Sequence, residues 1–282
     1  MVRLGIGRPA RLLFFALIVL YLAIPMVSVV VYSFSAKWTS TILPEAWTAA
    51  HWAEAAADDR MRDAIWRTVW MAALVLTLDV LLVVPAVYWQ RVRNPRIRVA
   101  LELSAAIPFV LPFVVIAFGM LKLAGQFFPE VLGTPWIVLL GHAAVAFPFL
   151  YWAVDGSMAA ANVVRLNEAA QACGATPMQT IRLVILPNIS AGLAAGGMLV
   201  FATSFAEFAI VQILAGARFE NVSLYSLNLL AGTTSEVEQL AVLTIVTFVV
   251  LFAISVGVVY LNRGRASGLF PGARAMAAER DA

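Results

Sequence analysis

Six long apolar runs constrain this chain more than any other feature. They cover residues 12–34, 65–89, 100–121, 135–155, 189–214 and 239–261. A helix needs roughly 20 apolar residues to cross the hydrocarbon core of a bilayer, and each run reaches that length. No run alternates apolar with polar residues as a barrel strand does, and lipid offers no partner to an open backbone. The sequence therefore predicts an all-α integral membrane protein with six transmembrane helices.

Composition supports this fold class and limits the remaining chemistry. The chain is 62% hydrophobic and only 12% charged, whereas a soluble domain averages about 25% charged residues. A single cysteine, Cys173, excludes an intramolecular disulfide. We assign residues 1–265 to one transmembrane domain. Residues 266–282 are rich in Gly, Ala and Arg without apolar periodicity, so we expect a disordered tail.

The distribution of charge predicts the orientation in the membrane. With the N-terminus inside, the inner segments hold most arginines, namely Arg3, Arg8, Arg11, Arg91, Arg93, Arg96, Arg98, Arg165, Arg182, Arg263, Arg265, Arg274 and Arg280. The outer segments hold most acids, namely Glu45, Glu54, Asp58, Asp59, Asp63, Glu130, Glu220, Glu236 and Glu238. Positive charge favours the cytoplasmic side, which predicts that both termini and the segment between the fourth and fifth spans are cytoplasmic.

Residues within the spans predict breaks and close packing. Pro108 and Pro112 in the third span should kink or break its helix. Gly192 and Gly196 in the fifth span have the spacing of a close-approach helix face. Aromatic residues at the span edges are predicted to be interfacial anchors: Trp66, Trp70, Tyr88, Trp89, Trp136, Tyr151, Trp152 and Tyr260.

Several kinds of enzyme are excluded by missing residues. A phosphate-binding P-loop needs Gly-Lys-Ser/Thr, and neither lysine of the chain, Lys37 or Lys122, follows a glycine. His51 and His142 are far apart in sequence, with no spacing typical of a metal site or a catalytic triad. We therefore expect no catalytic residues, no metal and no bound cofactor in this chain.

Acids at membrane depth are costly and are candidates for function. Glu102 and Asp155 lie near predicted span ends and are expected at the interface. Asp79 lies mid-span, where it either pairs within the bundle or lines a path.

Glu207 lies four residues after Thr203 and three after Ser204, so one helix face would carry all three side chains. That face would either line a cation-friendly cavity or form a buried structural pairing.

The stretch EAAQACGATPMQTIRLVILP, residues 168–187, is too short and too polar to cross the membrane. Gly174 suits a left-handed helix C-cap, while Thr176 can cap a second helix with Pro177 in its first turn. Pro187 is expected to end that second helix. Its apolar side should contain Met178, Ile181, Val184 and Ile185. The stretch therefore predicts a cytoplasmic helix-turn-helix.

At these residues the chain resembles the inner-membrane permeases of type I binding-protein-dependent ABC importers. Their cytoplasmic signature is Glu-Ala-Ala, three residues, Gly, nine residues, then Ile-x-Leu-Pro. The residues that fit this spacing are Glu168, Ala169, Ala170, Gly174, Val184, Leu186 and Pro187, with Val184 in place of the usual Ile. The six-span plan and the position of the loop also match.

The resemblance implies a role and a set of partners. The loop would form coupling helices that dock on a cytoplasmic ABC ATPase dimer, which uses ATP and Mg. A second permease subunit, expected to be a different chain, and an extracytoplasmic solute-binding protein would complete the importer in a bacterial inner membrane. Nucleic acid is not an expected partner.

The solute is narrowed by resemblance as well. KWTSTILPEAW, PFVLPFVVIAFG and SFAEFAIVQILAG look like segments of polyamine and 2-aminoethylphosphonate permeases, with iron and thiamine permeases as alternatives. A small amine-bearing or phosphonate-type solute would then pass Asp79, Thr203, Ser204 and Glu207, with Glu207 as an amine contact. An ion-coupled secondary transporter and a structural scaffold are the alternatives from other classes.

Overall fold

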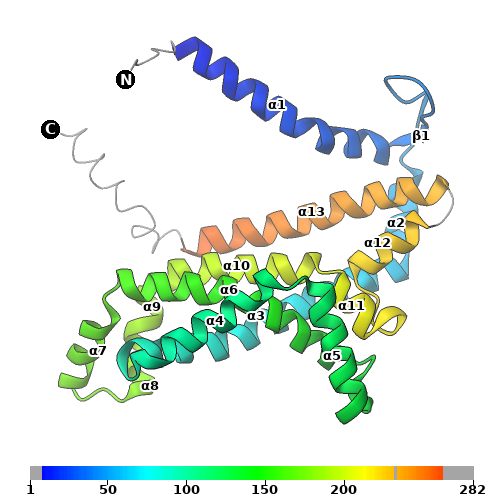
Figure 1. Ribbon diagram of the computed structural model, residues 1–282. Helices are drawn as coiled ribbons and strands as arrows, with labels where there is room; N and C mark the ends of the chain where they lie inside the picture. The colour runs from blue at the N-terminus through cyan, green and yellow to red at the C-terminus, as the bar shows by residue number, and fades with distance from the viewer. Residues whose placement is uncertain (1–7, 232–233, 263–282) are drawn as a thin grey trace. The chain divides into compact units, whose positions relative to one another are not determined.

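The computed structural model describes residues 8–231 and 234–262, so the predicted tail lies outside the described residues. The described chain is helical except for a short antiparallel ladder of β1 (Ser35–Lys37) and β2 (Ala46–Trp47). This confirms the predicted all-α class (Figure 1). The longer helices are α1 (Arg8–Ser33), α2 (Ala50–Ala57), α3 (Asp59–Val92), α4 (Arg98–Val110), α5 (Phe113–Phe127), α6 (Pro135–Ala160), α7 (Val163–Ala172), α10 (Ser190–Ala206), α12 (Val222–Leu230) and α13 (Thr234–Asn262). The shorter ones are η1 (Pro95–Ile97), η2 (Pro129–Val131), α8 (Pro177–Gln179), η3 (Thr180–Ile185), α9 (Leu186–Asn188), α11 (Ala209–Leu214) and η4 (Gly216–Phe219).

The candidate spans are of two kinds. Four single helices are long and apolar enough to cross a membrane: Leu12–Ser33 in α1, all of α3, all of α6, and Val237–Tyr260 in α13. Two further spans arise only if two bent helix pairs each count as one span, which brings the described part of the chain to as many as six. The pairs are Pro95–Val110 with Phe113–Phe127 and Pro177–Asn188 with Ser190–Ala206. The predicted first, second, fourth and sixth spans are therefore single helices.

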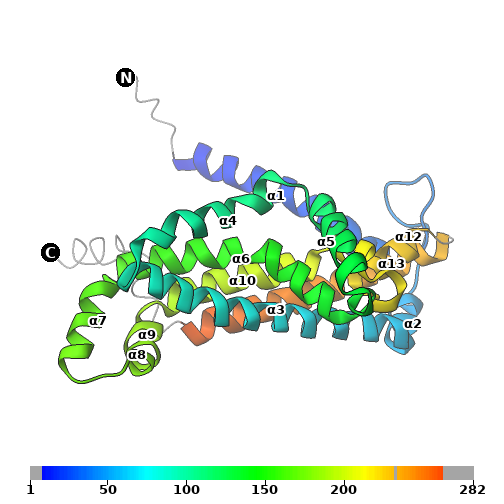
Figure 2. The same ribbon diagram turned by 60° about the horizontal axis from the view of Figure 1, so that its bottom comes forward.

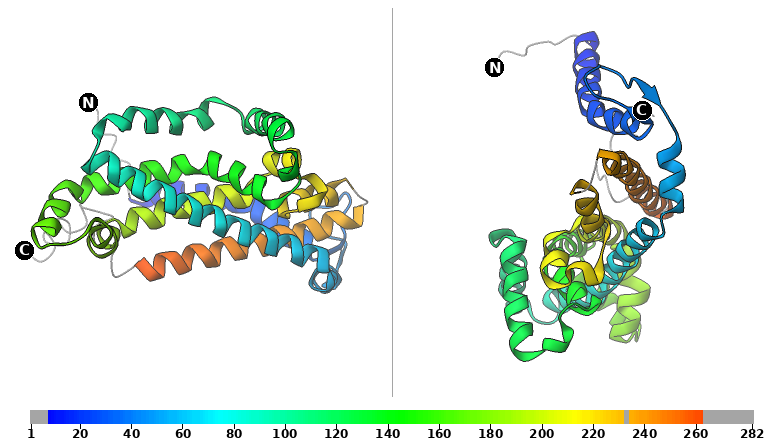
Figure 3. Two further views of the ribbon diagram at one scale, coloured as in Figure 1. Left: turned by 90° about the horizontal axis from the view of Figure 1, so that it is seen from below. Right: turned by 90° about the vertical axis from the view of Figure 1, so that its right-hand side faces the viewer.

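The third span is broken rather than continuous. Helix α4 ends at Val110 and α5 begins at Phe113, and the pair containing them is bent by 107° (Figure 3). Leu111 between them is extended, because a proline disfavours helical geometry in the residue before it. The predicted proline break is confirmed at Pro112, whereas Pro108 lies inside α4. The predicted third span, 100–121, is therefore made of two helices.

The fifth span also differs from the prediction of one helix over 189–214. Helix α10 ends at Ala206, Glu207 has an extended backbone, and α11 begins at Ala209. No proline or glycine lies at this break, so neither of these residue types causes it. The contacts of Glu207, given below, supply the physical reason.

The described chain forms two compact units, which we describe separately. The described residues of the larger unit are 63–225 and 251–262, and its described core contains Val75 of α3, Leu150 and Val154 of α6, and Val200 of α10. The described residues of the smaller unit are 8–62, 226–231 and 234–250, and they include α1, the β1–β2 ladder and α2.

The packing of α10 on α6 depends on glycine. A Cβ added at Gly196 would lie 2.7 Å from the Cβ of Ala153 and 3.3 Å from the Cα of Leu150, both on α6. A Cβ at Gly192 would collide with Ser157 of the same helix. The predicted close-approach face is therefore confirmed, and α6 is the helix that it meets.

Candidate functional site

The polar stretch 168–187 folds as two helices joined by a tight turn, at one end of the larger unit (Figure 2). Helix α7 carries Glu168, Ala169 and Ala170, and the chain turns at Gly174, whose φ is +82°. The amide of Gly174 donates to the carbonyl of Gln171 at 2.9 Å, which closes the end of the helix. A side chain in this left-handed conformation is strained, so the predicted glycine C-cap is confirmed.

The second helix begins with a reciprocal cap. The hydroxyl of Thr176 accepts a hydrogen bond from the backbone N–H of Gln179 at 3.4 Å, and the Gln179 side chain accepts one from the N–H of Thr176 at 2.8 Å. The predicted Thr176 cap is confirmed, with Pro177 in the first turn. The helix runs through α8, the π-helical η3 and α9, so the prediction that Pro187 ends it was wrong. The break lies at Ile189, where the helix axis bends by 81° into α10.

The four apolar residues predicted to share one side of this second helix are not equally buried. Ile185 is fully buried, and Ile181 and Val184 are half-buried. Met178 is 71% exposed, so its predicted place on that side was wrong. The π-helical turn between Met178 and Ile185 has more residues per turn than an α-helix and so changes their relative direction. Leu183, 68% exposed, adds a second large apolar side chain to the outer surface.

Polar contacts join α7 to α3. The hydroxyl of Tyr88 on α3 donates to the side-chain oxygen of Asn167 at 2.7 Å, and Asn167 directly precedes Glu168. Both side chains are buried, so the hydrogen bond is shielded from water. The prediction of Tyr88 as an interfacial anchor was wrong.

A second set of contacts joins α3 to α6 nearby. Tyr151 donates to Gln90 at 3.1 Å, and Asp155 accepts from Gln90 at 3.1 Å and from Arg91 at 2.7 Å. Tyr151 is buried and is not an exposed anchor, whereas Trp152 beside it is exposed as predicted. The two tyrosines thus connect helices within the bundle.

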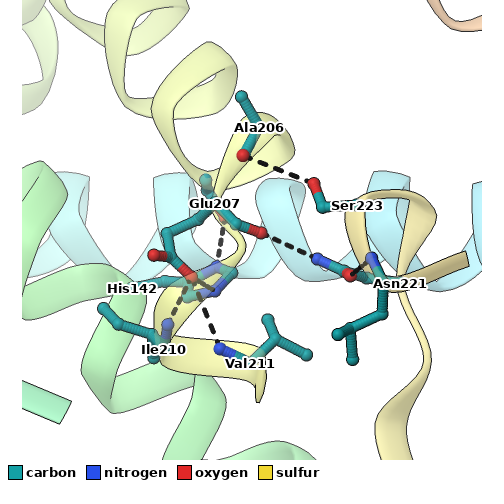
Figure 4. A network of polar contacts seen from close by, with 9 residues as sticks. His142, Ala206, Glu207, Ile210, Val211, Asn221 and Ser223 are labelled. Carbon is teal, nitrogen blue, oxygen red and sulfur yellow. Dashed lines mark hydrogen bonds and ion pairs between the residues drawn. The ribbon is translucent and has the colours of Figure 1, made fainter. Parts of the chain in front are cut away.

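The membrane-depth acid Glu207 fixes the break after α10 (Figure 4). Its carboxylate accepts hydrogen bonds from the backbone N–H groups of Ile210 at 2.9 Å and Val211 at 3.4 Å, and so caps the start of α11. Its backbone carbonyl accepts from the Asn221 side chain at 2.9 Å. Free N–H groups at a helix start favour a negative charge, which compensates for burial of the carboxylate.

His142 of α6 completes this cluster. Its Nδ1 lies 2.8 Å from the Ser204 hydroxyl, and its Nε2 lies 3.5 Å from the Glu207 carboxylate. His142 and Glu207 are 1% and 6% exposed, so this Ser-His-Glu arrangement is enclosed by the protein, and the described residues form no metal-binding group. Sequence reasoning missed His142, although a histidine inside an apolar run signals a buried partner.

The four predicted path residues separate into two places. Ser204 and Glu207 meet at His142, which matches the structural alternative given for them, while Thr203 lies half-buried on α10. Asp79 of α3 lines a different cavity of about 320 Å³, bordered by α3, α4 and α6. Asp79 is 1% exposed, and its Oδ2 has no hydrogen-bond partner among the described residues.

A family model matches more than half of the chain. It covers residues 82–266 and describes the inner membrane component of binding-protein-dependent transport systems. The matched range contains the loop 168–187 and both span breaks.

Curated relatives show the same kind of protein at low identity. The putrescine transport system permease protein PotI of Escherichia coli K12 is 27% identical over 213 residues, covering 74% of this chain and 75% of PotI. The probable ABC transporter permease protein y4fN of Sinorhizobium fredii is 29% identical over 192 residues, which is 62% of this chain and 33% of y4fN. This chain therefore spans about a third of the length of that second relative.

Solved structures agree on the fold alone. A bacterial ABC transporter involved in import of the acidic polysaccharide alginate matches with a TM-score of 0.66 at 16% identity, covering 93% of this chain and 98% of the other. The inward-facing MetNI methionine ABC transporter matches with a TM-score of 0.56 at 17% identity, covering 71% of this chain and 94% of the other.

Proposed function

We propose a coupling route and a solute class for this chain, which belongs to the family of binding-protein-dependent transport system inner membrane components. It is a multi-pass inner-membrane permease subunit of an ABC importer and not the ATPase. The family match favours this role over the ion-coupled alternative. ATP and Mg are used by a partner subunit.

The loop 168–187 is the proposed contact with a cytoplasmic ABC ATPase dimer. The observation that carries the proposal is its exposed outer surface, where Met178 and Leu183 leave large apolar side chains uncovered beside a small-residue helix. Exposed apolar side chains of this kind are typical of an interaction site. The residues assigned to coupling are Glu168, Ala169, Ala170, Gly174, Val184, Leu186 and Pro187.

The same loop has a route to the membrane. A push on α7 reaches α3 through the buried Tyr88–Asn167 hydrogen bond, and α3 reaches α6 through Gln90 and Tyr151. We place both termini in the cytoplasm on the same side as the loop. A second permease, a different chain, and an extracytoplasmic solute-binding protein complete the proposed importer.

Cys173 offers a direct test of the ATPase contact. It is the sole cysteine, and it is exposed in the turn beside Gly174. A photo-crosslinker attached to Cys173 in the assembled importer should link this chain to the ATPase. The control is Cys173→Ala combined with Ile42→Cys, which moves the label to the predicted outer side. A link to the ATPase from position 42 and none from position 173 would contradict the proposal.

A charge on the loop surface tests the same contact by function. Met178→Glu should uncouple ATP hydrolysis from transport without unfolding the chain, because Met178 already lies in solvent. The matched control is Ile42→Glu, which places the same change at a residue that is 94% exposed in the segment between α1 and α2. Equal transport by both variants would remove Met178 from the interface.

A small amine-bearing or phosphonate-type compound is the proposed solute. The likeness to PotI over 74% of this chain supports the polyamine class, and 2-aminoethylphosphonate shares its amine. Asp79 is the proposed path residue with a free carboxylate oxygen, and Thr203, Ser204 and Glu207 are the other residues proposed for the path. Iron and thiamine are the alternatives.

Uptake measurements decide among these solutes. Cells that express this chain with its partner subunits should accumulate radiolabelled putrescine or 2-aminoethylphosphonate, and cells that lack this chain alone should not. Thiamine and ferric iron are measured in parallel. Chain-dependent uptake of thiamine or iron, without uptake of either amine, would overturn the assignment.

A further inference from the structure

The cavity between α3, α4 and α6 combines an apolar wall with one buried acid. Its lining includes Leu82, Leu101 and Leu140 as well as the aromatic rings of Phe147 and Tyr151. A volume of about 320 Å³ lies at the lower end of the range of small-molecule pockets, roughly 300 to 1,000 Å³. The cavity therefore fits a compound of few heavy atoms.

Asp79 is the acidic residue of this lining, and among the described residues no Lys, Arg or His borders the cavity with it. Its buried Oδ2 has no hydrogen-bond donor among the described residues. A carboxylate oxygen taken out of water without a donor is unfavourable, and a donor that enters the cavity relieves that cost. The unpartnered Oδ2 of Asp79 thus points to a positively charged donor as the ligand of this cavity.

We propose that this cavity is a binding site for a small organic ammonium ion with an apolar body, held by Asp79. The ammonium group would donate to the free carboxylate oxygen, and the alkyl part would contact the leucine side chains. Phe147 and Tyr151 present aromatic rings in the same lining, and such rings also attract ammonium groups. An anion or a purely polar solute finds no matching group there.

The position of Asp79 argues against a lipid headgroup as the source of that ammonium. Asp79 lies 20 residues after the start of α3 at Asp59 and 13 before its end at Val92, well inside the 34-residue helix. Lipid amines lie at the interface and not at this depth. A free small amine is the occupant that the depth and the size of the cavity favour.

Binding to the purified full-length chain in lipid nanodiscs tests the site without transport. Isothermal titration calorimetry compares n-butylamine, 1-butanol and butyrate, which share an alkyl body and differ in the head. Butylammonium should bind at least about tenfold more tightly than butanol, the effect of one charge-assisted hydrogen bond. Butyrate should bind most weakly.

Three variants separate the carboxylate from the cavity. Asp79→Asn keeps the shape and should remove the preference for butylamine over butanol. Ala144→Phe fills the cavity from its rim and should weaken both ligands. Ala73→Phe adds the same ring to an exposed position of α3 outside the lining and should change neither.

Two results would overturn the proposal. One is equal binding of butylamine and butanol by the unmodified chain, which would show a site for apolar chains only. The other is an unchanged preference for butylamine in Asp79→Asn together with an unchanged affinity for both ligands in Ala144→Phe. This site rests on the proposed solute path, which already includes Asp79. Because no ATPase or solute uptake enters this measurement, its failure removes Asp79 from that path but leaves the permease role intact, and a failure of that role leaves this site intact.

Discussion

Two spans of the larger unit are interrupted, and they are interrupted by different means. The break between α4 and α5 lies at Pro112, which lacks a backbone N–H and holds Leu111 in an extended conformation. The break between α10 and α11 lies at Glu207, whose carboxylate caps the following helix and pairs with His142. The first break is local in sequence. The second depends on residues as distant as His142 and Asn221, so it should respond to changes far along the chain.

Replacing Glu207 should have the largest effect on the difference between the two breaks. Glu207→Ala leaves two helix-start N–H groups without their acceptor in a buried site and removes the carboxylate beside the Nε2 of His142. We expect the free energy of unfolding to fall by about 3 kcal/mol, measured by denaturant titration in micelles. Glu207→Gln retains an acceptor for the N–H groups and should lose less. Equal losses in the two variants would mean that the charge, and not the cap, holds the break.

Changing the distant partner should have the next largest effect. His142→Leu removes the group that contacts both Ser204 and Glu207. It should cost about 2 kcal/mol, because the buried Ser204 hydroxyl loses its hydrogen-bond partner and the buried Glu207 carboxylate loses the imidazole beside it. The double variant His142→Leu with Ser204→Ala should cost less than the sum of the single changes. Simple additivity would show that the cluster does not act as a unit.

The proline break should be far less sensitive. Pro112→Ala restores an N–H but leaves the surrounding packing in place, so we expect a loss of about 0.5 to 1 kcal/mol, chiefly through a more flexible unfolded chain. Spin labels at exposed positions of α4 and α5 report whether the bend persists. A straightened span would show that Pro112 alone maintains it.

Glu45 is an exposed glutamate, and its contacts should have a smaller effect than those of the buried Glu207. Glu45 accepts from Thr39 at 2.6 Å and pairs with Lys37 at 2.9 Å, and these contacts, Thr39 first, lower the pKa of Glu45 below its usual value. The contribution to stability is therefore present above the unfolded-state pKa and is lost as pH falls through the lowered folded-state pKa. Carboxyl NMR titration should show a larger upward pKa shift in Thr39→Val than in Lys37→Met. The reverse order would contradict the assigned cause.

These cases show which features a single sequence can predict. Pro112, Gly174 and Thr176 act through their own backbone conformation or immediate neighbours, so their roles follow from residue type and spacing. The apolar runs predict the spans because each run lies within one continuous stretch of the sequence.

Other roles arise only when distant helices meet. Tyr88 and Tyr151 were predicted to be interfacial anchors because tyrosine is common at the membrane interface. Their hydroxyl groups instead donate hydrogen bonds to the side chains of Asn167 and Gln90. The charge of Glu207 was visible in the sequence, whereas its contact with His142, 65 residues earlier, depends on the packing of α6 against α10. Hydropathy and helical periodicity carry no information on such pairs.

Because of the π-helical turn at Thr180–Ile185, the number of residues in the loop determines the direction in which its side chains point. Each residue of an α-helix advances the side-chain direction by about 100°, so one residue removed from this turn would rotate everything before it by about that angle. Met178 would then leave the outer surface, and Ile185 would keep its place in the core. A single deletion in this segment therefore acts as a rotation of the outer face, and the number of residues after Gly174 matters as much as their identity.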